Sequence, residues 1–182
     1  STIDGPAASL LADGILSSTA GALEVSGRLA DISTVLAGAP SGPLTFETET
    51  SREGDNWRFD VKTDGPAISL ASNGVVIDPT GPAPAIEGAV NAALSDLSIF
   101  SDLAQRRLTG SLTVDASGRA TADLSSFDIT ATASGNNVTT GIGELDTALA
   151  GALSADIKAA RDGDAISIET ARFSSNLVSA TV

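Results

Sequence analysis

Residues 44–63 alternate between apolar or threonine side chains and charged or polar side chains with a period of two. In LTFETET, Leu44 and Phe46 fall on one side of the chain, and in WRFDV the side chains of Trp57 and Phe59 do the same. This period is that of a β-strand with one buried face. The intervening REGDN is typical of a turn, so we predict a β-hairpin with one apolar face and one charged face.

The same alternation recurs along nearly the whole chain, in short segments between Gly, Asn, Asp and Pro residues. We predict strands in residues 21–32, 84–94, 108–116, 125–133, 151–160 and 164–171, and roughly ten strands or more in all. We predict turns at SNG (72–74), ASG (116–118), GNN (135–137) and RDGD (161–164).

Two segments break the alternation and predict short helices. Residues 94–107 and 140–150 space their apolar residues three and four positions apart, which favours a short amphipathic helix. Ser95 or Asp96 is suited to cap the first of these helices. Such helices most simply cover one end of a β-sheet.

No Pro/Ser/Gly-rich linker divides the chain, so we predict one continuous segment over residues 1–182, and this segment contains a weak internal repeat. LADIS followed by GPLTFETE resembles LSDLS followed by GSLTVDAS, which gives repeats of about 21–83 and 84–150. The chain has no Met and begins at Ser1 without a leader-like segment, so we expect it to be a fragment of a larger protein.

Composition excludes several classes of function. Ten basic and 23 acidic residues give a net charge of −13, which opposes binding to nucleic acid. With no His and no Cys, the usual ligands of transition metals and the usual base of a nucleophilic triad are missing. We therefore expect no catalytic residues, no metal site, no cofactor and no enzymatic activity.

Large side chains are scarce, because the chain has five Phe, one Trp and no Tyr. Small inward residues suit either a flattened β-sandwich or solenoid, or an open trough curled about its apolar face. We favour the second arrangement, an all-β fold with one or two short helices, in which a long, largely antiparallel curled sheet forms an open hydrophobic groove. Thirteen apolar side chains are expected to line it: Leu23, Val25, Phe46, Phe59, Val61, Ile86, Val90, Leu112, Val114, Ile129, Leu153, Ile157 and Ile168.

Two stretches carry a resemblance to a known family. DLSIFSDLAQRRLTGSLTVDASG (96–118) and NVTTGIGELDTALAGALSADIKAARDGDAISIE (137–169) resemble repeated segments of TamB-type translocation and assembly module proteins, especially alphaproteobacterial ones. The resemblance is best over residues 84–182, and related AsmA-like proteins share the strand pattern. The aromatic C-terminal end of the family is missing, which indicates an interior part of the groove.

The resemblance implies a periplasmic location, as part of a protein anchored in the inner membrane, and a long hydrophobic β-groove, the β-taco. It implies passage of phospholipid between the inner and outer membranes, assistance to outer-membrane protein assembly, or both. The implied partners are phospholipid acyl chains or nascent outer-membrane strands, and a TamA-like barrel protein. The alternative is a secreted or surface β-solenoid adhesin or passenger domain. For the open groove, the unpaired first and last strands of such a fragment are expected to favour self-association.

Overall fold

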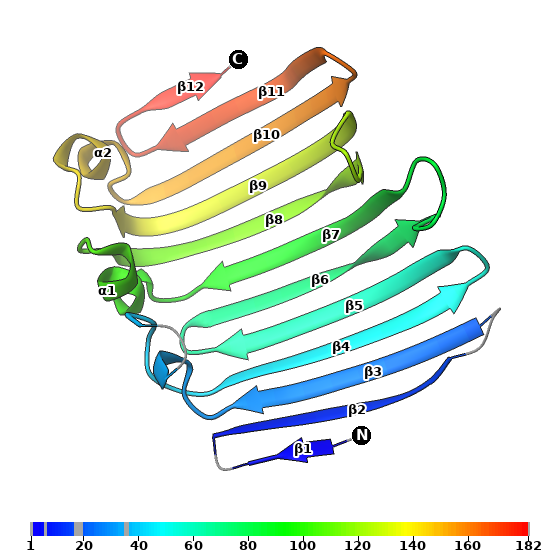
Figure 1. Ribbon diagram of the computed structural model, residues 1–182. Helices are drawn as coiled ribbons and strands as arrows, with labels where there is room; N and C mark the ends of the chain where they lie inside the picture. Colours follow the sequence, from blue (N-terminus) through cyan, green and yellow to red (C-terminus); the bar gives the residue numbers. More distant parts are fainter. Residues whose placement is uncertain (1, 6, 17–19, 35–36, 182) are drawn as a thin grey trace.

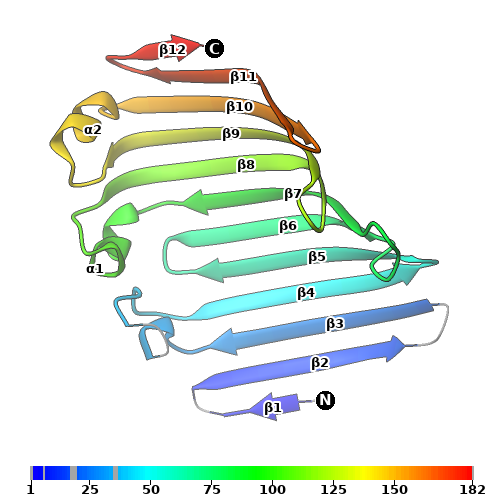
Figure 2. The same ribbon diagram turned by 45° about the horizontal axis from the view of Figure 1, so that its top comes forward.

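The computed structural model describes residues 2–5, 7–16, 20–34 and 37–181, and these form one antiparallel sheet of twelve strands. Each strand pairs with the next one along the chain, from β1 at one edge to β12 at the other, so the sheet is open (Figure 1). Figures 1 and 2 show that the sheet is twisted and curled. The expected all-β class, with an open and curled antiparallel sheet, is confirmed.

The first half of the sheet contains seven strands: β1 (Thr2–Asp4), β2 (Ala8–Leu16), β3 (Ala20–Leu29), β4 (Leu44–Glu53), β5 (Asn56–Gly65), β6 (Ile68–Ile77) and β7 (Ala85–Leu94). The second half contains five: β8 (Thr109–Thr121), β9 (Ser126–Thr139), β10 (Ala152–Asp162), β11 (Ala165–Ser175) and β12 (Ser179–Thr181).

Two hairpins close with glycine in the left-handed conformation. Glu53 pairs with Asn56 around Gly54, which has φ +63°, and Asp162 pairs with Ala165 around Gly163, which has φ +58°. Each loop has two residues between the paired positions, and such a short loop needs a residue that adopts positive φ. The even loop length leaves the apolar residues of both strands on the same face.

Three of the five predicted turns are wrong, whereas REGDN forms the predicted turn between β4 and β5. SNG (72–74) lies inside β6, ASG (116–118) inside β8 and GNN (135–137) inside β9. Their glycines lie where neighbouring strands approach each other closely, so they mark close packing within the sheet. RDGD (161–164) forms the predicted turn, since it joins β10 to β11.

In the part of the chain that the structure describes, four short helical segments lie at one end of the strands. They are η1 (Ile32–Thr34), η2 (Leu97–Phe100), α1 (Ser101–Ala104) and α2 (Gly143–Ala148). They follow β3, β7 and β9. Because each strand is antiparallel to the next one along the chain, the odd-numbered strands run in the same direction and end on the same side of the sheet (Figure 1). Both predicted helical regions are therefore helical, and Asp96 caps η2 by accepting a hydrogen bond from the Ser98 amide.

The two parts of the internal repeat occupy equivalent positions in the sheet. Leu29 pairs with Leu44 across β3 and β4, and Leu94 pairs with Leu112 across β7 and β8. In the first connection, the carboxylate of Asp31 accepts hydrogen bonds from the amide and hydroxyl of Ser33. Asp96 and Ser98 repeat the amide hydrogen bond in the second connection. The repeated sequence thus forms the same turn twice.

The sheet is a single layer without a packed core. Among the residues whose burial the structure describes, Ala85 is buried at 4 % exposure and no other apolar side chain is. The accessible surface is 11066 Å², whereas a compact monomer of this mass exposes about 8,100 Å². A flattened sandwich is excluded, because two packed sheets would bury the side chains between them.

Candidate functional site

One face of the sheet carries the thirteen apolar side chains expected to line a groove. Cross-strand register places them all on the same face, for example through the pairs of Val61 with Ser72 and of Ser72 with Val90. We call this the apolar face. The structure brings together the whole set: Leu23, Val25, Phe46, Phe59, Val61, Ile86, Val90, Leu112, Val114, Ile129, Leu153, Ile157 and Ile168.

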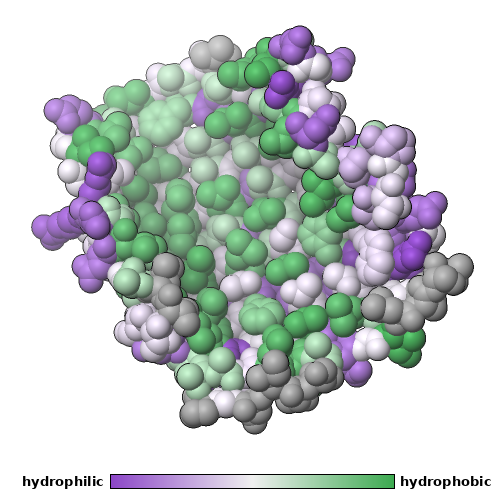
Figure 3. Space-filling model, viewed as in Figure 1, coloured by the Kyte–Doolittle hydropathy of each residue, from purple (hydrophilic) through white to green (hydrophobic). Residues whose placement is uncertain are grey.

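The apolar face is continuous and partly open to solvent. Figure 3 looks onto it and shows apolar side chains over a hollowed middle, with polar side chains around the rim. Ile86 is 46 %, Ile157 48 % and Ile168 61 % exposed. In folded proteins, contiguous exposed apolar surfaces of this kind are found where partners, ligands or membranes bind.

Glycines in the middle of the apolar face bring three strands unusually close. Gly74, Gly88 and Gly118 lie opposite one another on β6, β7 and β8. A Cβ atom added at Gly88 would lie 3.0 Å from the Gly74 Cα atom, and one added at Gly118 would lie 2.9 Å from the Ile129 Cα atom. Any side chain at these positions would force the strands apart, so the close approach of the three strands depends on the missing side chains.

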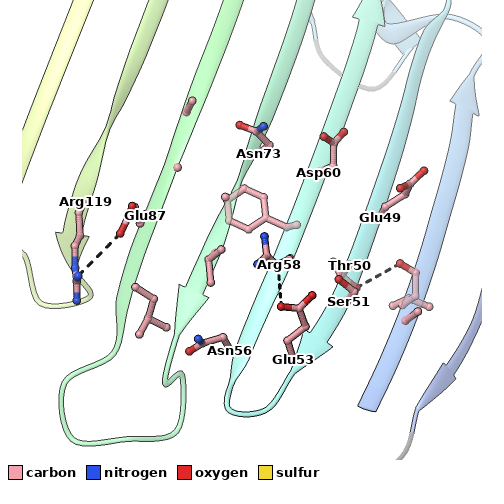
Figure 4. A pocket seen from close by; sticks show the side chains of 18 of the residues that line it. Glu49, Thr50, Ser51, Glu53, Asn56, Arg58, Asp60, Asn73, Glu87 and Arg119 are labelled. Carbon is pink, nitrogen blue, oxygen red and sulfur yellow. Dashed lines mark hydrogen bonds and ion pairs between the residues drawn. The ribbon is translucent and has the colours of Figure 1, made fainter. Parts of the chain in front are cut away.

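The opposite face, which we call the polar face, carries most of the charged side chains, and its described residues line three grooves. The largest groove has a volume of about 1490 Å³ and crosses the sheet from β2 to β9 (Figure 4). Seven carboxylate side chains and two guanidinium groups line it. A twisted sheet is saddle-shaped, so each face is hollowed along a different direction. The alternation in sequence separated the two faces correctly but did not predict this second, polar hollow.

Ion pairs on the polar face are exposed and mostly local. Arg58 Nε lies 3.1 Å from Glu53 Oε2, and Arg119 Nη1 lies 4.0 Å from Glu87 Oε2 (Figure 4). Lys62 lies opposite Glu47 in register, but its ammonium group is 3.6 Å from Asp60. Exposed pairs of this kind add little to stability.

One row of the polar face places four carboxylates side by side. Asp13, Glu24, Glu49 and Asp60 are consecutive cross-strand neighbours on β2 to β5. Like charges directly opposite each other in a sheet repel. The described residues contain no group of three or more side chains arranged to hold a metal ion, so we do not interpret this row as a metal site.

Three Asp residues in the connections between strands accept hydrogen bonds from the serine two residues further along the chain. Asp123 accepts hydrogen bonds from the Ser125 amide at 3.0 Å and from the Ser125 hydroxyl at 2.8 Å. These bonds, the amide bond first, lower the pKa of Asp123 to about 2. Hydrogen bonds from Ser33 and from Ser98 lower the pKa values of Asp31 and Asp96 in the same way.

Two arginines on the apolar face were not predicted as site residues. Arg52 and Arg161 are the last apolar-face residues before the β4–β5 and β10–β11 hairpins, and each donates an Nε hydrogen bond of 2.8 Å to a glycine carbonyl in its turn. Their sequences, REGD and RDGD, are closely similar. That similarity was a usable signal, but both segments were interpreted only as turns.

Within the described residues, no helix combines the length and the apolar character needed to cross a membrane. Comparisons of the chain with protein-family models, with curated proteins and with solved structures gave no significant match.

Proposed function

We propose that this chain is a segment of a hydrophobic groove that conducts phospholipid between the inner and outer membranes of a diderm bacterium. The observation that supports this best is the uncovered apolar face, which runs without interruption over successive strands. Acyl chains need only such a continuous apolar surface, and they would cover what the fold leaves exposed. The proposal needs no catalytic group.

The proposed setting is the periplasm, in a longer protein of the TamB type that works with an outer-membrane barrel protein. The resemblance of residues 96–118 and 137–169 to that family motivates this setting. The acidic polar face suits it as well, because charged side chains keep a single-layer sheet in solution while the other face holds lipid.

A role in outer-membrane protein assembly is a second candidate, and a specific feature favours it. Within the described residues, β12 pairs with Arg172–Ser174 of β11, and no described strand pairs with the outer edge of β11 over residues 165–171. An unpaired edge is a template for a nascent strand. The β-solenoid alternative fits less well, since a solenoid stacks repeated coils whereas these strands pair antiparallel in chain order.

The test replaces one apolar-face side chain with a charge and compares it with a charge on the other face of the same strand. Ile157→Asp places a carboxylate on the apolar face at a site that is 48 % exposed, so water still reaches it and the fold should survive. Ser154→Asp is the matched control, because Ser154 is exposed and lies on the polar face of β10.

We expect the wild-type chain and Ser154→Asp to retain phospholipid through purification, and Ile157→Asp to retain much less while its melting temperature stays close to that of the control. Lipid extraction with mass spectrometry and thermal unfolding measure both properties. Absence of lipid from the wild-type chain, and failure to take it up from vesicles, would contradict the proposal.

A further inference from the structure

A single row of the apolar face, next to the hairpins, contains both of its charged side chains. Through cross-strand pairs this row runs Arg52, Trp57, Val76, Ile86, Ala120, Phe127 and Arg161, from β4 to β10. No other paired strand residue on the described apolar face is charged. The chain as a whole has a net charge of −13. The two charged side chains of the described apolar face are nevertheless both positive, and both lie at the same rim.

We propose that Arg52 and Arg161 bind the phosphate groups of anionic phospholipids whose acyl chains lie along the strands on the apolar face. This inference rests on the proposed lipid-conducting function and adds to it an orientation and a preference for charge. The headgroup lies at the hairpin rim, and the acyl chains point toward the rim that carries the helices.

Each arginine is held in place by one nitrogen and keeps other donors available. The Nε atoms bond the carbonyls of Gly54 and Gly163, which fixes each guanidinium over its turn. Arg52 Nη2 lies 4.0 Å from the solvated carboxylate of Asp55, and Arg161 forms no ion pair with a described residue. The remaining N–H groups can form the charge-assisted hydrogen bonds that arginine makes with phosphate.

Each arginine also lies beside an aromatic ring in the same row. Arg52 is 6.0 Å from the ring centroid of Trp57, and Arg161 is paired with Phe127. Aromatic rings next to cations are common where an apolar surface meets a polar headgroup region. In both places an arginine and an aromatic residue are directly opposite each other in register, at two hairpins on the same side of the sheet (Figure 1).

The dimensions of the apolar face suit this orientation. From Arg52 to Leu44 at the other end of β4 is eight residues, or about 26 Å of extended strand. The acyl chains of one bilayer leaflet span about 15 Å. Arg52 and Arg161 are separated by six strand spacings, about 29 Å, so they would form two separate headgroup positions.

Trp57 is the single tryptophan of the chain, and it lies in this row, so its fluorescence reports lipid orientation directly. The probes are phosphatidylglycerol brominated near the carboxyl end of the acyl chain, and phosphatidylglycerol brominated near the methyl end. We expect the first lipid to quench Trp57 more strongly than the second. Stronger quenching by the second lipid, or equal quenching, would overturn the proposed orientation.

Affinity is tested with two double variants that carry the same change in charge. Arg52→Gln with Arg161→Gln removes both cations of the apolar face, whereas Arg58→Gln with Arg119→Gln removes two cations of the polar face. Native mass spectrometry measures the affinities. We expect the first variant to bind unlabelled phosphatidylglycerol about tenfold more weakly than wild type does. Its affinity for phosphatidylcholine should stay within about twofold of the wild-type affinity. The polar-face variant should bind both lipids nearly as wild type does.

Equal phosphatidylglycerol affinity in the two double variants would overturn the arginine sites. Lipid uptake that is normal but indifferent to headgroup charge would overturn them too, and would leave the proposed conduit intact. If neither lipid binds to the wild-type chain or quenches Trp57, the proposed function itself fails. The two failures are therefore distinguishable.

Discussion

The ring of Phe59 lies over Gly74, the residue directly opposite it on the neighbouring strand β6. A Cβ atom added at Gly74 would lie 2.8 Å from Phe59 Cζ, and it would also contact the carbonyl oxygen of Glu87. The same relationship joins Phe46 and Gly27 on β4 and β3. Each phenylalanine ring thus occupies the space that a side chain on the opposite residue would take, and the glycine leaves that space free.

We predict that Gly74→Ala destabilises the sheet by about 1–3 kcal/mol, because the added methyl group overpacks against backbone and ring. For a chain of this size, each kcal/mol lowers the melting temperature by about 2–4 °C. Circular dichroism melting curves measure the change. Gly143→Ala is the control, because no atom lies within 4 Å of its added Cβ and it begins α2, where alanine is favoured. A melting temperature of Gly74→Ala equal to that of the control would contradict the packing argument.

The row of carboxylates on the polar face gives a second prediction. Glu49 lies between Glu24 and Asp60, so Glu49→Lys converts two repulsive neighbours into two attractive ones. We expect a gain of about 0.2–1 kcal/mol for each pair at low ionic strength, and a smaller gain in high salt, because salt screens exposed charges.

Glu47→Lys is the control on the same strand. Glu47 lies opposite Lys62, so the substitution creates a like-charge neighbour and should not stabilise the protein. Thermal unfolding at low and high salt measures both variants. The electrostatic argument fails if Glu49→Lys and Glu47→Lys change the melting temperature equally at low salt.

The strands and their faces were predictable because the alternation is strict. Phe59 and Val61 face the apolar side for the same reason that Asp60 faces the polar side, and register errors would reverse all three together. Gly74 was misassigned to a turn because glycine favours both turns and close strand approaches, and sequence alone does not separate these uses.

The arginines at the rim were missed for a different reason. Arg52 and Arg161 occupy positions of the alternation where apolar residues are expected. Only the register of the six strand pairs from β4 to β10 shows that they share one row. The bulge between Lys158 and Ala159 was equally invisible, because one extra residue in β11 leaves no clear mark in the pattern.

Acid should weaken the turn that Asp123 holds. Its pKa of about 2 in the folded chain is lower than the value of about 3.9 expected when unfolded, so the unfolded state takes up a proton first as the pH falls. The stability that the carboxylate contributes is fully present above about pH 4 and is lost as the pH falls from about 4 to about 2.

Asp123→Asn isolates this contribution, because asparagine accepts similar hydrogen bonds but does not titrate. Other carboxylates also titrate in this range, so the informative quantity is the difference in unfolding free energy between wild type and variant, measured by denaturant titration at each pH. We expect wild type to lose stability relative to Asp123→Asn as the pH falls from 4 to 2. A difference that does not vary with pH would contradict the assignment.

The unpaired outer edge of β11 gives the last prediction, which concerns self-association. No described strand pairs with the outer edge of residues 165–171, so isolated copies of this chain should pair edge to edge at high concentration and separate on dilution. Ser167→Lys places a cation on this edge and should weaken the pairing several-fold, because two cations would meet in the paired state. Thr132→Lys, on the polar face of the interior strand β9, makes the same change in charge away from the edge and should have little effect. Sedimentation velocity over a concentration series compares the three chains. A dimer that persists at nanomolar concentration, or that both lysine variants weaken equally, would show that the copies associate through another surface.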